Sequence, residues 1–248
     1  MMSNIIAVVS GKGGVGKTTF SINLAATLNE FGRECIIVDA DIANPNIGLK
    51  LGIPHVSLSL QDVLDGNASI HHSVFIHPTG LRIIPSSISM DKINIDMERL
   101  REVLEELNEL IIVDSPPGMG DDVRAIMKAA DSIIVITNPE HAAVIDAVKI
   151  IKMAKDMRKS NIYVVINRVN GDVYELTEDE IELMCETPII SKISEDPNIR
   201  KSSFENIPII HRNPYSQASI DYRYLASRLL RQEYKPPSFL FLRRLLNR

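Results

Sequence analysis

The stretch Ser10-Gly11-Lys12-Gly13-Gly14-Val15-Gly16-Lys17-Thr18-Thr19 decides how this sequence of 248 residues is interpreted. From Gly11 onward it matches the spacing G-x-x-x-x-G-K-[ST], and it lies between a short apolar run and a helical pattern. Glycines let backbone N–H groups converge on phosphate oxygens, and the start of the helix adds its dipole. We therefore predict a phosphate-binding loop, with Lys17 on the β and γ phosphates of ATP and the Thr18 hydroxyl on Mg²⁺.

A second apolar run ends in an acid at Leu110-Ile111-Ile112-Val113-Asp114 and is followed by Ser115-Pro116-Pro117-Gly118. This pattern is typical of a Walker B strand, in which the final aspartate holds the magnesium ion of the nucleotide. We expect Asp114 to bind Mg²⁺ through water, and Gly118 to place its backbone N–H near the γ-phosphate. Without the phosphate-binding loop, a simple turn cap would be the better interpretation of Asp114.

The order of the apolar runs indicates the fold class. Most runs are apolar throughout, which indicates strands buried on both faces, as in a parallel sheet covered by helices. We predict an α/β fold with a doubly wound, mostly parallel sheet in a three-layer α/β/α sandwich. The predicted strands cover residues 5–9, 35–39, 81–85, 110–114, 132–137, 162–167 and 188–192. The predicted helices cover residues 18–31, 97–108, 121–130, 141–159, 177–185 and 214–233.

Composition and charge exclude several classes of protein. Apolar residues make up 45% and charged residues 24%, as in an ordinary globular domain. Cys35 and Cys185 form no C-x-x-C pair, so we expect neither a disulfide framework nor a cysteine metal site, and a reducing cytoplasm fits. The net charge is −5, but residues 223–248 hold seven Lys or Arg and one acid. The rest of the chain is therefore strongly acidic, which makes nucleic acid an unlikely partner.

Lys12 is not required by a general phosphate-binding loop. The letters K-G-G-V-G-K-T-T resemble the deviant Walker A loop of the MinD/ParA group of P-loop ATPases. The resemblance implies a homodimer with ATP, in which Lys12 crosses the interface and contacts the nucleotide of the other subunit. A second positive charge in a dry interface would stabilise the phosphoryl group in transfer. The simpler alternative is an exposed lysine that attracts ATP.

Further site residues follow from the same resemblance. Val38-Asp39-Ala40-Asp41 is similar to the family's D-x-D element, which implies that Asp41 orients the attacking water and that Asp39 lies nearer the metal. Two carboxylates at i and i+2 of a strand point to the same side, although two solvated acids remain the alternative. At the base-binding end, Asn167 with Arg168 and Asp196 with Pro197 are expected to contact adenine. Asn167 could equally be a turn residue.

The C-terminal end carries a second signal. Pro236-Pro237 separates an ATPase domain over residues 1–235 from a tail over residues 236–248. On a helical wheel, large apolar side chains of the tail fall on one side and arginines on the other, with only Leu240 out of place. The tail resembles the family's membrane-targeting helix, and the alternative is a tail that packs on its own domain. The residues expected to contact an anionic membrane are Phe239, Leu242, Arg243, Arg244, Leu245 and Leu246.

These features predict an ATPase switch that dimerises with ATP, binds the membrane in that state and positions cell-division or other machinery. Its hydrolysis of ATP would be slow without an activating or cargo protein, and the protein would be cytoplasmic with reversible, peripheral membrane association. One alternative is a ParA-like partition ATPase that binds DNA non-specifically. Others are ATPases that set flagellum or archaellum number or position chemoreceptors. An iron–sulfur ATPase of the same fold normally needs interface cysteines, which Cys35 and Cys185 do not resemble.

Overall fold

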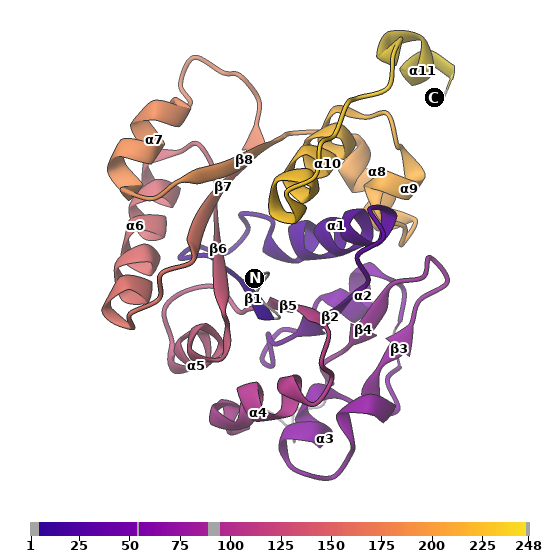
Figure 1. Cartoon of the computed structure of the whole chain (residues 1–248), viewed down its shortest axis with the longest axis vertical. Helices are drawn as coiled ribbons and strands as arrows, with labels where there is room; N and C mark the ends of the chain where they lie inside the picture. Colours follow the sequence, from indigo (N-terminus) through magenta and orange to yellow (C-terminus); the bar gives the residue numbers. More distant parts are fainter. Residues whose placement is uncertain (1–4, 54, 89–94, 247–248) are drawn as a thin grey trace.

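The structure, a computed structural model, describes residues 5–53, 55–88 and 95–246. Eight strands form one sheet in the order β3-β4-β2-β5-β1-β6-β7-β8. All neighbouring strands are parallel except the edge pair β3 and β4, which is antiparallel (Figure 1). The strands are β1 (Ile5–Val9), β2 (Cys35–Asp39), β3 (Phe75–Ile76), β4 (Arg82–Ile84), β5 (Leu110–Asp114), β6 (Ser132–Thr137), β7 (Ile162–Val169) and β8 (Ile189–Ser194).

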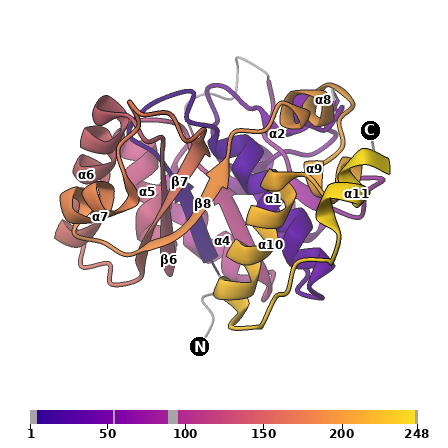
Figure 2. The ribbon, with the colours of Figure 1, turned by 90° about the horizontal axis from the view of Figure 1, so that it is seen from above.

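Helices cover both faces of the sheet (Figure 2). One layer holds α1 (Lys17–Glu30), α2 (Ile47–Lys50), α8 (Asn198–Phe204), α9 (Ile209–Arg212) and α10 (Gln217–Leu230). The other holds α3 (Leu60–Leu64), η1 (Ile70–Ser73), η3 (Met97–Arg99), α4 (Leu100–Glu105), α5 (Asp121–Ala129), α6 (His141–Asp156) and α7 (Glu178–Cys185). Successive side chains of β1 enter the two cores in turn, with Ile6 and Val8 facing α1 and Ala7 and Val9 facing α5. The predicted three-layer α/β fold is confirmed.

The central place of β1 sets the position of the site. It pairs with β5 on one side and β6 on the other, so Val8 lies beside Asp114 and Val9 beside Val135. In open α/β sheets, ligands bind outside the carboxyl ends of the strands where the strand order reverses. The loop after β1 leaves the sheet at this edge, as do the ends of β2 and β5.

The structure also differs from the sequence-based expectations. The edge strand β3 and the short helices α2, α3, α8 and α9 were not predicted, because two to seven residues are too few for a clear periodicity. The last domain helix begins at Gln217 instead of residue 214, since Ser216 accepts the N–H of Ser219 as its N-cap. It ends at Leu230 instead of residue 233, where Arg231 adopts a left-handed conformation with φ 54°. None of the described helices is long and apolar enough to span a bilayer.

Candidate nucleotide-binding site

The loop after β1 has the backbone geometry that its glycines allow. Gly14 and Gly16 have φ of 80° and 99°, in the left-handed region that other residues rarely adopt. Gly16 is the N-cap of α1, so the free N–H groups at the start of this helix face the loop. A Cβ atom on Gly16 would also lie 2.5 Å from Nδ2 of Asn167. The loop therefore forms a cradle of backbone amides at the start of a helix of 14 residues, which suits an anion.

The side chain of Lys17 lies inside this cradle. Its side chain is nearly buried, and its Nζ donates to the Oγ of Ser10 at 2.9 Å. Burial lowers the pKa of Lys17, and the nearby carboxylates of Asp114 and Asp41 oppose that shift. A buried ammonium group with few hydrogen-bond partners is stabilised strongly by contact with an anion. Phosphate oxygens would provide that contact.

The carboxylate of Asp114 has the surroundings expected of a magnesium ligand. Its Oδ1 accepts the Ser21 hydroxyl at 2.9 Å, and its Oδ2 is buried and has no hydrogen-bond partner within the described part of the chain. Burial raises the pKa of Asp114 to about 6, although the hydroxyl of Thr18 and the charge of Lys17 lower it. A buried carboxylate oxygen without a partner, close to a threonine hydroxyl, fits a hard cation that binds oxygen ligands. Thr18 and Asp114 would hold that ion.

Asp39 and Asp41 organise the loop after β2. Both oxygens of the buried Asp39 are in use, because Oδ2 accepts the N–H groups of Asn46 and Ile47 at 2.9 Å and Oδ1 that of Asp41 at 3.3 Å. Burial and the neighbouring Asp114 raise the pKa of Asp39 to about 8, while these N–H groups lower it. The sequence did not reveal this role in fixing the start of α2. The metal contact of Asp39 stays a prediction.

Asp41 lies at the mouth of the site. Its Oδ1 accepts the N–H of Asn44 at 3.0 Å. Burial raises its pKa, and the N–H of Asn44 and the charge of Lys17 lower it. A carboxylate with a raised pKa beside the phosphate-binding lysine is suited to accept a proton from water.

Lys12 has a different environment from Lys17. Its side chain is 47% exposed, and its Nζ lies 3.7 Å from Oε2 of Glu140, the N-cap of α6. The helix α6 also touches the loop directly. A Cβ atom on Gly11 would lie 2.6 Å from the carbonyl oxygen of Asp146, so this position has no room for a side chain. The sequence motif alone attributes Gly11 to phosphate binding and does not reveal this packing against α6.

Gly118 contacts the phosphate-binding loop from the other side. Its N–H, expected near the γ-phosphate, donates to the carbonyl of Ser10 at 2.9 Å, and its φ of 97° requires glycine. The structure thus brings the Walker B turn and the loop into contact. A phosphate contact of this N–H would require the hydrogen bond to Ser10 to open.

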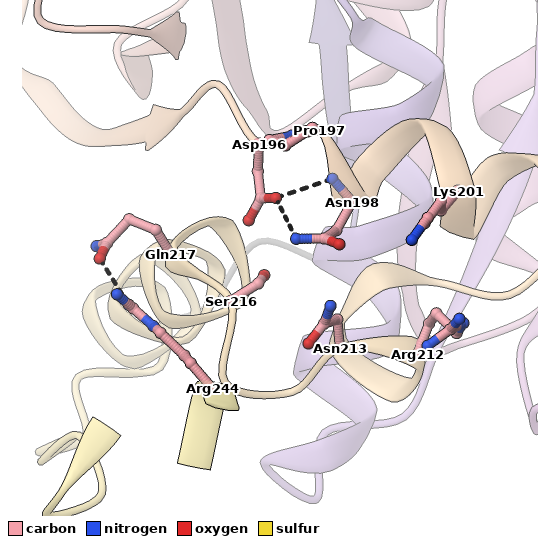
Figure 3. Close-up of a pocket in the computed structure, with 9 residues that line it drawn as sticks. All are labelled: Asp196, Pro197, Asn198, Lys201, Arg212, Asn213, Ser216, Gln217 and Arg244. Carbon is pink, nitrogen blue, oxygen red and sulfur yellow. Dashed lines mark hydrogen bonds between the residues drawn. The ribbon is translucent and has the colours of Figure 1, made fainter. Parts of the chain in front are cut away.

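The residues expected at the base lie at the ends of β7 and β8. Asn167 is buried and donates through Nδ2 to the carbonyl of Val15 at 2.7 Å, so it supports the phosphate-binding loop. Nε of Arg168 lies 3.8 Å from Oε2 of Glu195. Asp196 accepts a hydrogen bond from the backbone N–H of Asn198 at 2.9 Å and one from its Nδ2 at 2.8 Å (Figure 3). Pro197 is the N-cap of α8. Contacts of these residues with adenine stay predictions.

The sequence model of the ParA family, described as "NUBPL iron-transfer P-loop NTPase", matches residues 1–230. The chain belongs to the ParA/MinD family of P-loop NTPases. An uncharacterised ATP-binding protein of Methanocaldococcus jannaschii is 37% identical, with 95% of this chain and 90% of the relative covered. The septum site-determining protein MinD of Bacillus subtilis is 31% identical, with 92% and 90% covered. The structure of MinD from Pyrococcus horikoshii complexed with Mg-ADP superposes with a TM-score of 0.84 at 29% identity, with 91% and 95% covered.

The cysteines of this family member do not face the site. Cys35 and Cys185 are both free and buried, and burial raises their pKa to about 12 and about 11. Within residues 5–53, 55–88 and 95–246, no three His, Cys, Asp or Glu side chains form a group that could hold a metal ion. A thiol with a raised pKa is a poor nucleophile and a poor metal ligand. We interpret both cysteines as core residues.

The tail contacts its own domain through its arginines. It forms α11 (Leu240–Leu246), where Nη1 of Arg243 donates to the Tyr215 hydroxyl at 3.1 Å and the guanidinium lies 5.2 Å from the centre of that ring. Arg244 donates to the Tyr215 carbonyl at 2.7 Å and to Oε1 of Gln217 at 2.9 Å. Three apolar side chains face solvent with exposed fractions of 78%, 79% and 53%: Phe239, Phe241 and Leu242. The side chains of Leu245 and Leu246 lie outside the described part of the structure.

Proposed function

We propose that this family member is an ATPase switch that dimerises with ATP, binds an anionic membrane in that state and positions other cellular machinery. The contrast between the two lysines of the loop carries this proposal. Lys17 is nearly buried in the phosphate cradle, whereas the Lys12 side chain is 47% exposed on its rim. Lys17 is thus available to the chain's own nucleotide, whereas Lys12 would leave its surface contact with Glu140, 3.7 Å long, to meet the nucleotide of a facing subunit.

Hydrolysis would depend on three groups around the cradle. Lys17 and the N–H groups of the loop would hold the phosphates, and Thr18 with Asp114 would hold Mg²⁺, which neutralises charge on the phosphates when it is bound. Asp41 would orient the attacking water and accept its proton. Asp39 would couple the nucleotide site to the start of α2, because its carboxylate accepts hydrogen bonds from the backbone N–H groups of Asn46 and Ile47.

Membrane binding would come from the exposed side chains of the tail. A short tail that exposes Phe239, Phe241 and Leu242 around a helix of seven residues binds a bilayer weakly as a single copy. Two tails on one ATP dimer would bind together, and such avidity can strengthen attachment by about 10² or more. The nucleotide would control membrane residence in this way. The similarity to MinD of Bacillus subtilis, named for septum-site determination, favours cell division as the process served.

Two paired measurements test the proposal. Size-exclusion chromatography with Mg·ATP should show a dimer for the wild type and a monomer for Lys12→Ala, whereas Lys152→Ala, at an exposed position of α6, should dimerise normally. Sedimentation with anionic vesicles should show binding with ATP and little with ADP, and loss of binding when residues 238–248 are deleted. Equal binding with both nucleotides, or binding that survives the deletion, would contradict the proposed switch.

The partition-type alternative rests on the basic residues 223–235, and part of this stretch is used inside the domain. The buried Arg223 pairs with Glu30 at 3.0 Å, and Nη1 of Arg228 donates to the carbonyl of Ile190 at 2.6 Å. A guanidinium held in this way has fewer donors left for DNA phosphates. These contacts favour the membrane proposal over DNA binding.

A further inference from the structure

A cavity of about 430 Å³ lies where the tail meets the domain, away from the phosphate-binding loop. Three cationic side chains line it from three different elements: Lys201 of α8, Arg212 of α9 and Arg244 of α11 (Figure 3). The cavity has the size of a small-ligand site. The tail is part of its wall, so the cavity is complete only when α11 is docked.

The charges around the cavity favour an anion. The Lys201 ammonium forms no hydrogen bond or ion pair with any residue that the structure describes, although Glu205 lies close enough to feel its charge. Arg244 uses Nε and Nη2 on Tyr215 and Gln217, which leaves Nη1 for another acceptor. Arg212 is the one of the three that already has a carboxylate partner, Glu205.

The single carboxylate in the wall does not offset these cations. Asp196 is buried and accepts two hydrogen bonds from Asn198 and a longer one, 3.4 Å, from the N–H of Ala218. Figure 3 shows its carboxylate turned toward Asn198. The start of α10, a helix of 14 residues, adds the positive end of its dipole at Ser216 and Gln217.

From this geometry we infer that the cavity between α8, α10 and the docked tail binds a phosphate ester, and that the head group of an anionic phospholipid is the ligand it takes at a membrane. Phe239, Phe241 and Leu242 are exposed on the same docked tail. When these side chains enter the bilayer, lipid phosphates come to the level of the tail's arginines. The lipid source rests on the proposed membrane binding, whereas the phosphate site does not.

The position of the site gives the tail's docked form a function. Arg244 contributes to the cavity only while it is held by Tyr215 and Gln217. A lipid phosphate that bridges Arg244 and Lys201 would strengthen that contact, because hydrogen bonds between charged groups are about twice as strong as neutral ones. The membrane would therefore bind the domain together with the tail, in a fixed orientation.

The test uses the full-length chain saturated with Mg·ADP, so that the phosphate-binding loop is occupied. Glycerol phosphate and inorganic phosphate are titrated by calorimetry, and anionic vesicles are titrated with Mg·ATP. Lys201→Ala should weaken glycerol phosphate binding about tenfold or more, as expected for loss of a charge-assisted contact. Arg200→Ala is the matched control, an exposed cation on the same helix that does not line the cavity.

The outcomes separate the two proposals. If Lys201→Ala weakens vesicle binding about tenfold and Arg200→Ala by no more than about fivefold, the ligand is a lipid head group, since one surface charge contributes about fivefold. If glycerol phosphate binding depends on Lys201 but vesicle binding does not, the site takes a soluble phosphate ester. If the wild type binds neither glycerol phosphate nor inorganic phosphate, or if both variants behave alike, the site does not exist. Wild-type protein that binds phosphate but no vesicles would refute only the membrane switch.

Discussion

Asn167, at the end of β7, donates its side-chain amide to the carbonyl of Val15 in the phosphate-binding loop, 152 residues earlier in the chain, at 2.7 Å. The same amide nitrogen lies 2.5 Å from the position that a Cβ atom on Gly16 would take, which is too close for a side chain there. The residue expected to recognise the base therefore supports the loop that binds the phosphates. A contact of Asn167 with the base would therefore couple base recognition to the shape of the phosphate-binding loop through one side chain.

Replacing Asn167 tests this connection. Asn167→Ala leaves the Val15 carbonyl without its partner and should lower the affinity for ATP by about 5- to 30-fold, since a lost buried hydrogen bond costs about 1–2 kcal/mol. Binding of a fluorescent ATP analogue measures the change. Asn170→Ala, an exposed neighbour in the following loop, should bind ATP normally. Unchanged affinity in Asn167→Ala would mean that the loop holds its shape without this contact.

A methyl group at Gly11 should be poorly tolerated. Gly11→Ala places a Cβ atom 2.6 Å from the carbonyl oxygen of Asp146, and backbone cannot move aside as a flexible side chain can. We expect a loss of about 1–3 kcal/mol in the free energy of unfolding, measured by urea denaturation. Gly13→Ala is the control, because its nearest neighbours, two atoms of Pro117, would lie 3.9 Å away. Similar stabilities of the two variants would contradict the packing of α6 on the loop.

The pH dependence of stability should reflect the buried acids. Burial raises the pKa of Asp39 to about 8 and that of Asp114 to about 6, above the ordinary value of 3.8. The folded state therefore holds these protons more tightly than the unfolded state, so the stability contributed by these two acids is full at low pH and is lost as pH rises from about 4 to about 8.

Thermal unfolding in EDTA without nucleotide measures this fall between pH 5.5 and 8.5. Each acid contributes at most about 1.4 kcal/mol per pH unit inside its window. Asp39→Asn should flatten the profile, and Asp156→Asn, at the exposed end of α6, should leave its slope unchanged. A slope that is the same in Asp39→Asn and in the wild type would be inconsistent with a buried, protonated Asp39.

Asp41 should matter for hydrolysis more than for binding. Asp41→Asn removes the proposed proton acceptor and should slow ATP turnover about 10²-fold or more, with ATP affinity changed only a few-fold. Phosphate release and equilibrium binding, measured on the same preparation, separate the two effects. Asp122→Asn removes a neighbouring charge that raises the pKa of Asp41, and this variant should still turn over ATP.

The docking of the tail depends on Tyr215. Tyr215→Ala removes both the hydroxyl acceptor and the ring under Arg243, so residues 240–246 should exchange backbone hydrogens faster. Tyr215→Phe keeps the ring and should give an intermediate exchange rate, because the cation–π contact contributes about 0.5–1 kcal/mol at an exposed site. Equal exchange in the wild type and both variants would show that the tail is held elsewhere.

The sequence predicted the architecture well because its main signals are local. The loop motif, the all-apolar strands and the acid at the end of β5 each lie within about ten residues. The structure brings the loop and this acid to one edge of the sheet. The role of Asp39 in capping α2 was missed because α2 has four residues and no periodicity. The contact of Gly11 with Asp146 and that of Asn167 with Val15 join residues more than 130 positions apart. No pattern in a single sequence reports such pairs.

The tail shows another limit of sequence patterns. A helical wheel places the arginines of the tail on one side and most of its large apolar side chains on the other, but it could not say which side faces the domain. The structure turns the arginines inward, onto Tyr215 and Gln217, because that surface offers oxygen acceptors and an aromatic ring. A tail that turns its arginines to the domain and leaves large apolar side chains in solvent departs from the usual order of a globular protein.

The close approach of Gly11 to α6 has a consequence for how an activator could work. The helix extends over 16 residues, about 24 Å at 1.5 Å per residue, and its first half touches the loop after β1. A protein that bound to the outer surface of this helix would shift the loop by moving the helix as a rigid body. It would not need to insert a side chain into the nucleotide site. Turnover could then be accelerated from the surface of the molecule, because the close contact of Gly11 with α6 would transmit the movement of the helix to the loop.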